Sequence, residues 1–139
     1  MKEKIKVIIA DDNVVFCNTM KVYLETYEEI EILGTAYTDE EEIKMIQKLK
    51  PDIVITDLMR NHKYTGLEII KHYISQGNSP QFLVISADNR SNIWNEQLKL
   101  GGYITKPIID YSVIIKELLR IRLEIIKNNQ IIIDKIKQL

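Results

Sequence analysis

The sequence predicts an α/β fold in which a doubly wound parallel sheet is covered by helices on both faces. Two observations predict it: five short apolar, β-branched segments recur along the chain, and a segment with helical spacing of apolar residues follows each of them. Strands that alternate with helices in this way form parallel sheets, because right-handed crossovers bring helices to either face. The length of 139 residues and the 45% hydrophobic content indicate one compact domain.

The five predicted strands are nearly continuous apolar runs, as expected of strands that are buried on both faces. They lie at residues 4–10, 30–36, 53–56, 82–85 and 103–105.

Apolar residues at three- and four-residue spacing predict the helices between these strands. The first helix spans residues 13–27, with Asp12 or Asn13 placed to cap its start. Asp39, followed by Glu42 three positions later, resembles a capping box at the start of the second helix, which Pro51 ends. The other helices are predicted after the polar loop 60–65, within residues 89–100, and from residue 110 onward.

The composition excludes other classes of protein. A formal net charge of -1 lacks the broad positive field that nucleic-acid binding requires, so no direct contact with nucleic acid is expected. No run approaches the roughly 18 apolar residues of a membrane span, and the N-terminal apolar run is too short for a signal peptide. The single cysteine, Cys17, excludes an internal disulfide framework and is expected in the core. These features favour a cytoplasmic protein.

Polar residues follow four of the five predicted strands. Asp11 and Asp12 follow the first strand, Asp57 the third, Ser86 the fourth and Lys106 the fifth. Ligand sites of doubly wound sheets lie beyond the carboxyl ends of the strands, so these side chains are expected to converge. Asp12 taken alone is equally well explained as a helix cap.

Converging carboxylates need a cation, because two of them about 4 Å apart repel by about 4 kcal/mol at an effective dielectric near 20. Their hard oxygens suit Mg²⁺ better than zinc, and neither His62 nor His72 has a partner at ligand spacing. A carboxylate beside Mg²⁺ can attack phosphorus and form an acyl phosphate, and Asp57 is the best candidate. Lys106 would then hold the phosphoryl group, and Ser86 would donate a hydrogen bond to it.

The motifs IIADDN, VITDLM, VISAD and YITKP resemble the receiver domain of bacterial two-component response regulators. This resemblance covers about residues 4–127 and implies a flavodoxin-like sheet with strand order 2-1-3-4-5. It implies a receiver domain at residues 1–127, with 128–139 as a helical extension or a linker to an output domain. The implied partner is a sensor histidine kinase. The implied chemistry is limited to Mg²⁺-dependent self-phosphorylation and self-dephosphorylation.

The resemblance also implies the roles of individual residues. Asp57 becomes the phosphoacceptor, and Asp11, Asp12, Asp57 and the backbone carbonyl of Met59 become the Mg²⁺ ligands.

On the other side of the implied site, Ser86, Ala87 and Lys106 bind the phosphoryl group. Ser86 and Tyr103 match the switch pair, which alters the surface of the fourth helix, fifth strand and fifth helix when the domain is phosphorylated. The bond between Lys106 and Pro107 is expected to be cis.

The loop LMRNHKYTG departs from the pattern of the family. Arg60 and Asn61 stand in it, and Gly66 comes one position late. Arg60 has two open roles, contact with the phosphoryl group or solvation, and solvation is favoured. Because the loop is altered, the alternative function is a pseudo-receiver, an interaction module with this fold that is not phosphorylated.

The segment between Ser86 and Lys106 is shorter than is usual in the family, so the fourth helix is expected to be short or displaced. Trp94 in this helix is either a partner-binding anchor or a packing residue, and packing is favoured.

The C-terminal run from residue 114 to residue 139 is longer than a helix that only covers the sheet. Its apolar residues keep the spacing of a helical seam, interrupted at Asn128. Asn128 and Asn129 provide an alternative, in which one helix ends there and another begins at Ile131. The excess apolar surface has three possible roles: a contact with a second copy, a link to an output domain, or a pad on the same domain. The first two are favoured.

Overall fold

A computed structural model describes residues 3–77 and 80–139 of the chain. Within these residues, five parallel strands form one sheet in the order β2-β1-β3-β4-β5. The predicted α/β fold and strand order are both confirmed. The strands are β1 (Ile5–Ala10), β2 (Ile30–Ala36), β3 (Ile53–Thr56), β4 (Gln81–Ser86) and β5 (Gly102–Thr105).

Helices connect the strands as predicted, and their ends are set by local hydrogen bonds. They are α1 (Val14–Leu24), α2 (Asp39–Leu49), α3 (Thr65–Ser75), α4 (Ser91–Gln97) and α5 (Ser112–Lys137).

The capping predictions were partly right. Asn13 caps α1, because its side chain accepts a hydrogen bond from the Phe16 N–H at 3.0 Å. The capping pair predicted for α2 was wrong by one position. Thr38, in an extended conformation, accepts from the Glu41 N–H, which leaves Asp39 inside the first turn of the helix.

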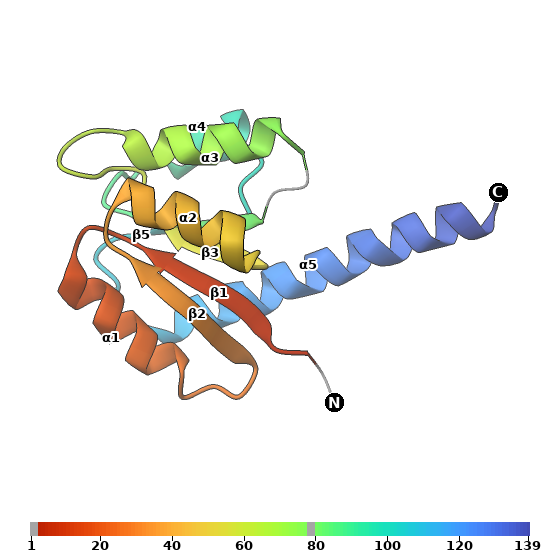
Figure 1. Cartoon of the computed structure of the whole chain (residues 1–139), viewed down its shortest axis with the longest axis horizontal. Helices are drawn as coiled ribbons and strands as arrows, with labels where there is room; N and C mark the ends of the chain where they lie inside the picture. The colour runs from red at the N-terminus through yellow and green to blue at the C-terminus, as the bar shows by residue number, and fades with distance from the viewer. Residues whose placement is uncertain (1–2, 78–79) are drawn as a thin grey trace.

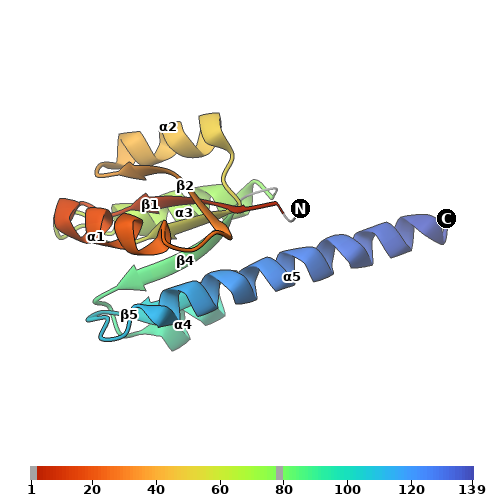
Figure 2. The ribbon, with the colours of Figure 1, turned by 90° about the horizontal axis from the view of Figure 1, so that it is seen from below.

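The strands send alternate side chains into two cores, one on each face of the sheet. On one face, Val7 and Ile9 pack with buried residues of α1 and α5, among them Cys17 and Leu118. On the other face, Ile8 packs with buried residues of α2 and α3. Figure 2 shows α2 and α5 on opposite sides of the sheet. Cys17 is fully buried, which confirms its predicted place in the core.

Helix α4 is short, as expected, and none of its residues is buried. Its C-cap, Leu98, is extended rather than helical, so the helix stops before the predicted end at residue 100. Trp94 is half-buried and packs against the core beside α3. This agrees with the favoured packing role of Trp94.

Helix α5 is continuous through Asn128 and Asn129, so the alternative with two helices was wrong. Its first part is buried at Ile114, Leu118 and Ile121. Figures 1 and 2 show its last part extending beyond the rest of the molecule. Ile132 there is 56% exposed, so this apolar surface does not form a pad on the same domain.

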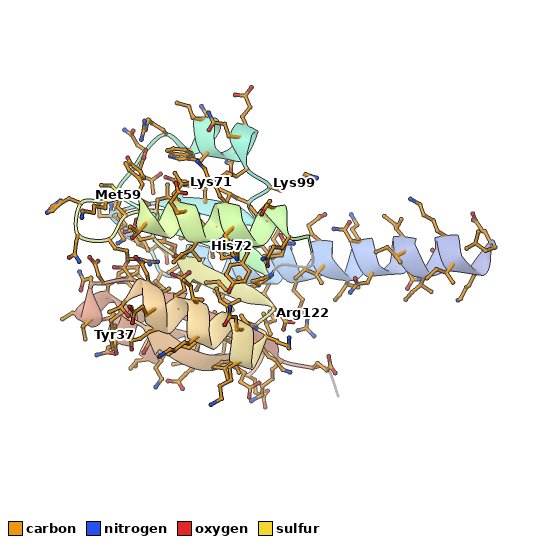
Figure 3. The ribbon with its side chains drawn as sticks, turned by 45° about the horizontal axis from the view of Figure 1, so that its top comes forward. Tyr37, Met59, Lys71, His72, Lys99 and Arg122 are labelled. Atoms are coloured by element: carbon orange, nitrogen blue, oxygen red, sulfur yellow. The ribbon has the colours of Figure 1, made fainter. Side chains whose placement is uncertain are left out.

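All five strands point their carboxyl ends toward one edge of the sheet, because they are parallel. Figure 3 shows Met59 and Tyr37, which follow β3 and β2, at the end of the molecule opposite the projecting part of α5. The candidate site therefore lies far from the C-terminus. Across residues 3–77 and 80–139, no helix has the length and apolar character needed to cross a membrane.

Candidate functional site

The structure brings together the charged residues that follow β1, β3 and β5. The Lys106 Nζ lies 2.9 Å from Asp11 Oδ2 and 3.1 Å from Asp57 Oδ2. It also lies 4.4 Å from the centroid of the Phe16 ring, which adds a cation–π contact. The ammonium group thus bridges the two carboxylates and offsets their mutual repulsion.

Burial and the neighbouring charges together shift the pKa values of Asp11 and Lys106. Burial raises the pKa of Asp11, although the Asn13 N–H and the Lys106 ammonium both favour the charged carboxylate. For Lys106, burial by itself would lower the pKa. The hydrogen bonds and charges of Asp11 and Asp57 outweigh burial and hold the pKa of Lys106 above its usual value. Lys106 is therefore charged at neutral pH.

A cleft of about 280 Å³ opens beside these residues, and Asp12, Asp57, Met59, Ser86 and Ala87 all line it. The Met59 N–H donates to Asp57 Oδ1 at 3.2 Å, which leaves the carboxylate oriented at the cleft with 12% of its side chain exposed. Ser86 is buried behind it.

The oxygen donors at this cleft are chemically suited to Mg²⁺. Asp12, Asp57 and the backbone of Met59 offer hard oxygens, and the cleft leaves room for the water molecules that Mg²⁺ retains. Asp11 is buried, and its Oδ2 accepts a hydrogen bond from Lys106. Among the residues that the structure describes, no three His, Cys, Asp or Glu side chains are already arranged to hold a metal ion. The three-carboxylate convergence expected from the sequence is thus seen only in part.

Ser86 and Tyr103 lie on neighbouring strands and both contact Asp88. The Ser86 Oγ accepts a hydrogen bond from the Asp88 N–H at 3.2 Å, and the Tyr103 hydroxyl donates to the Asp88 carbonyl at 2.5 Å. Burial raises the pKa of Tyr103 to about 12, so its hydroxyl stays protonated and remains a donor. The adjoining Lys106–Pro107 peptide bond is cis.

Comparison with known proteins decides the family of this chain. Residues 7–119 match the family model of the response regulator receiver domain. The chain belongs to this family. Receiver domains are signalling domains rather than enzymes, they pair with histidine kinases, and they generally bind Mg²⁺ at their phosphorylation site.

Individual relatives support the same assignment. The chain is 30% identical over 103 residues to the transcriptional regulatory protein YdfI of Bacillus subtilis, which covers 73% of this chain and 47% of YdfI. It is similar to RcsB of Salmonella enterica serovar Typhimurium, solved bound to the promoter rprA with the phosphomimetic BeF3-. The TM-score is 0.73 and the identity 26%, over 86% of this chain and 61% of RcsB. The chain therefore spans about half to three fifths of these two relatives.

The isolated receiver domain of the same RcsB, also solved with BeF3-, gives a TM-score of 0.64. It shares 28% identity with this receiver, over 75% of this chain and 78% of that domain.

Arg60 of this receiver is buried, so the favoured expectation of a solvated side chain was wrong. Its side chain is 5% exposed, and its guanidinium lies 2.6 Å from Asp39 and 2.8 Å from Glu42. The physical reason is Glu42, which is fully buried on α2, four residues before the buried Ile46. A buried carboxylate requires a compensating cation, and Arg60 supplies it. The acidic residue on the apolar face of α2 was the available sequence signal.

Asp88 is a second residue whose role the sequence did not reveal. Its carboxylate accepts hydrogen bonds from the Arg90 guanidinium, the Trp94 indole N–H and the Tyr64 hydroxyl. The Arg90 hydrogen bonds hold the pKa of Asp88 well below its usual range. This charged carboxylate joins the loop after β3 to the start of α4.

Neither histidine belongs to a group of metal-ligating side chains among the described residues. His62 is exposed at the mouth of the cleft, and His72 is exposed on α3, with its Nε2 3.2 Å from the Gln76 amide nitrogen.

Proposed function

We propose that this receiver domain accepts a phosphoryl group on Asp57 from a sensor histidine kinase and passes the signal on through the surface of α4, β5 and α5. One observation carries the proposal: the partly exposed Asp57 carboxylate lies at a cleft, with the charged Lys106 ammonium 3.1 Å away. A nucleophile and a cation for the transferred group are the two parts that phosphoryl transfer to a carboxylate requires.

In the proposed transfer, an oxygen of Asp57 attacks the phosphorus atom of a phosphohistidine, the phosphorus–nitrogen bond breaks, and an acyl phosphate forms. Lys106 then pairs with the phosphoryl oxygens instead of the carboxylates. Bound Mg²⁺ would neutralise charge on the transferred oxygens. Asp12, Asp57 and the Met59 carbonyl would hold it at the cleft, together with Asp11.

The proposed switch uses Ser86, Ala87 and Tyr103. The Ala87 N–H and the Ser86 hydroxyl donate to the phosphoryl oxygens, and Ser86 moves toward the group. Because the Ser86 Oγ also accepts a hydrogen bond from the Asp88 N–H, this movement alters the loop that contains Asp88. The Asp88 carbonyl accepts the hydrogen bond of the Tyr103 hydroxyl, so Tyr103 is affected in turn. The change then reaches α4 and β5.

For the C-terminal part, we propose a receiver domain at residues 1–127 and an extension at residues 128–139. The extension meets either an output domain or a second copy of the chain, because its apolar residues are exposed. RcsB was solved on promoter DNA, but a net charge of -1 argues against nucleic-acid contact by this chain itself.

Phosphorylation can be tested by incubating the purified chain with acetyl phosphate and Mg²⁺ and measuring its intact mass. The wild-type chain should gain the mass of one phosphoryl group, and Asp57→Asn should gain none. An unchanged wild-type mass would contradict the proposal.

A second candidate function is the pseudo-receiver. It is favoured by the altered loop after Asp57, in which Arg60 is buried and pairs with Asp39 and Glu42. Mg²⁺-dependent binding of beryllofluoride, followed by mass or fluorine NMR, would exclude this candidate.

A further inference from the structure

The loop after Asp57 folds into a tight turn. The Arg60 N–H donates to the Lys63 carbonyl at 2.8 Å, and the Lys63 N–H donates to the Arg60 carbonyl at 3.0 Å. The two residues between them, Asn61 and His62, both have positive φ, at 50° and 62°. This is the pattern of a type I′ turn. Positive φ is uncommon for residues other than glycine, although Asn and His adopt it more readily than most, so contacts from the surrounding structure help to hold this turn.

The side chain of Arg60 provides that hold from inside the molecule. Its Nη1 contacts Asp39 at 2.6 Å, and its Nη2 lies 2.8 Å from Glu42 and 2.6 Å from the Thr56 hydroxyl. Asp39 and Glu42 belong to the first turn of α2, and Thr56 ends β3. The guanidinium therefore fastens the turn to two elements of the rigid fold.

The tip of the same turn reaches the candidate site. The Asn61 N–H donates to Asp12 Oδ2 at 3.1 Å, and Asn61 lines the cleft together with Asp12 and Asp57. Asp12 follows β1 and is exposed, so it has few other restraints. The series of contacts from Glu42 through Arg60 and Asn61 therefore ends at Asp12, a proposed Mg²⁺ ligand.

Stability alone does not account for this network. A buried ion pair contributes little net stability, because removing two charges from water offsets their attraction, and apolar residues of similar size often replace such pairs without loss. Glu42 is fully buried, and its two carboxylate oxygens make no hydrogen bond of good geometry within the described part of the chain. What the network does fix is the position of the turn.

We propose that Arg60 is a positioning residue, which holds the 60–63 turn so that the Asn61 N–H keeps the Asp12 carboxylate at the cleft and thereby sets the affinity of the site for Mg²⁺. The inference rests on the proposed phosphoacceptor function and deepens it. Arg60 touches neither the metal nor the transferred group. It acts through Asn61 and Asp12.

The test compares four variants of the full chain: Arg60→Met, Arg60→Lys, Lys63→Met and the double variant Arg60→Met with Glu42→Leu. The double variant removes both members of the buried pair, so no unpaired charge is left in the core and the chain is expected to keep its fold. Lys63→Met is the matched control, because it removes an exposed cation from the same turn.

Two quantities are measured: binding of Mg²⁺ to the unphosphorylated chain by calorimetry, and the rate of phosphorylation by acetyl phosphate as Mg²⁺ is raised. The double variant should melt near the wild type but bind Mg²⁺ about 10-fold more weakly, as expected when a residue supporting a metal ligand is lost. Saturating Mg²⁺ should restore its maximal rate. Arg60→Lys should lie between the double variant and the wild type, and Lys63→Met should match the wild type.

A folded double variant with wild-type Mg²⁺ affinity would overturn the role of Arg60. If Arg60→Met alone fails to fold, the double variant and Arg60→Lys still decide the question. Failure of the wild type itself to bind Mg²⁺ or to gain a phosphoryl group would instead refute the proposed function, so the two failures are distinguishable.

Discussion

At the scale of single residues, Asp88 connects side chains from separate segments next to the proposed switch pair, Ser86 and Tyr103. Its carboxylate is 5% exposed and accepts from Arg90, Trp94 and Tyr64. Asp88→Asn keeps the size of the side chain but removes the charge that strengthens these hydrogen bonds. We expect a loss of about 2 kcal/mol in the free energy of unfolding at neutral pH, measured by urea denaturation.

The free energy of unfolding that Asp88→Asn loses should depend on pH, and the direction of this dependence can be predicted. The pKa of Asp88 is lower in the folded than in the unfolded chain, so its stabilisation is present above the ordinary value of 3.8 and is lost as the pH falls below it. The difference between wild type and Asp88→Asn should be constant from neutral pH to about pH 5 and should shrink below about pH 4. A difference that grew on acidification would contradict this assignment of charge.

The individual residues also show where sequence reasoning reached its limit. Asp57 and Lys106 were predicted to meet because the rule for parallel sheets places strand ends at one edge. Arg60 was missed because its partners lie on α2, and no local spacing tells which buried acid a loop arginine will reach. The contact of Asp88 with Tyr64 was missed for the same reason, since Tyr64 comes from the distant loop after β3, whereas Arg90 and Trp94 are near Asp88 in the sequence.

At the scale of elements, α4 is the helix held least firmly. It has seven residues, none of them buried, and the Trp94 indole N–H ties it to Asp88. In hydrogen exchange followed by mass spectrometry, amides of α4 should exchange before those of α3, which buries Leu67 and Ile70. Equal protection of the α3 and α4 amides would contradict the expectation that α4 is held less firmly than α3.

The strands and the helix starts were predicted to within one or two residues, whereas the C-terminal ends of α1 and α4 were predicted three residues too late. Continuous apolar runs mark buried strands directly. Helix ends depend on which polar side chain captures which N–H, as the start of α4 shows. The Asp88 carboxylate accepts from the Arg90 N–H at 2.9 Å, and the helix begins only after that residue. Several polar residues compete for this role in the sequence.

At the scale of the whole molecule, the direction of the exposed apolar stripe on α5 restricts how it can be covered. An α-helix repeats its direction after about 18 residues, or five turns. Ile132 and Ile136 therefore face the same side as Ile114 and Leu118, which are buried against the sheet. If two copies paired their α5 helices in parallel and in register, the helix of each copy would overlap the sheet of the other copy. This clash excludes parallel pairing in register and favours an antiparallel approach of the second copy's helix.

This geometry gives a prediction about oligomeric state. If a second copy covers the stripe, the full chain should sediment as a dimer at micromolar concentrations, and either truncation after Lys127 or the double change Ile132→Lys with Ile136→Lys should yield monomers. Both changes fall in the last part of α5, which projects away from the rest of the molecule in Figure 1, whereas Asp57 directly follows β3. Phosphorylation by acetyl phosphate should therefore stay within about twofold of wild type. A full chain that stays monomeric would contradict pairing and leave an output domain as the proposed occupant of the stripe. A truncated chain that lost phosphorylation would show instead that α5 beyond Lys127 supports the receiver fold.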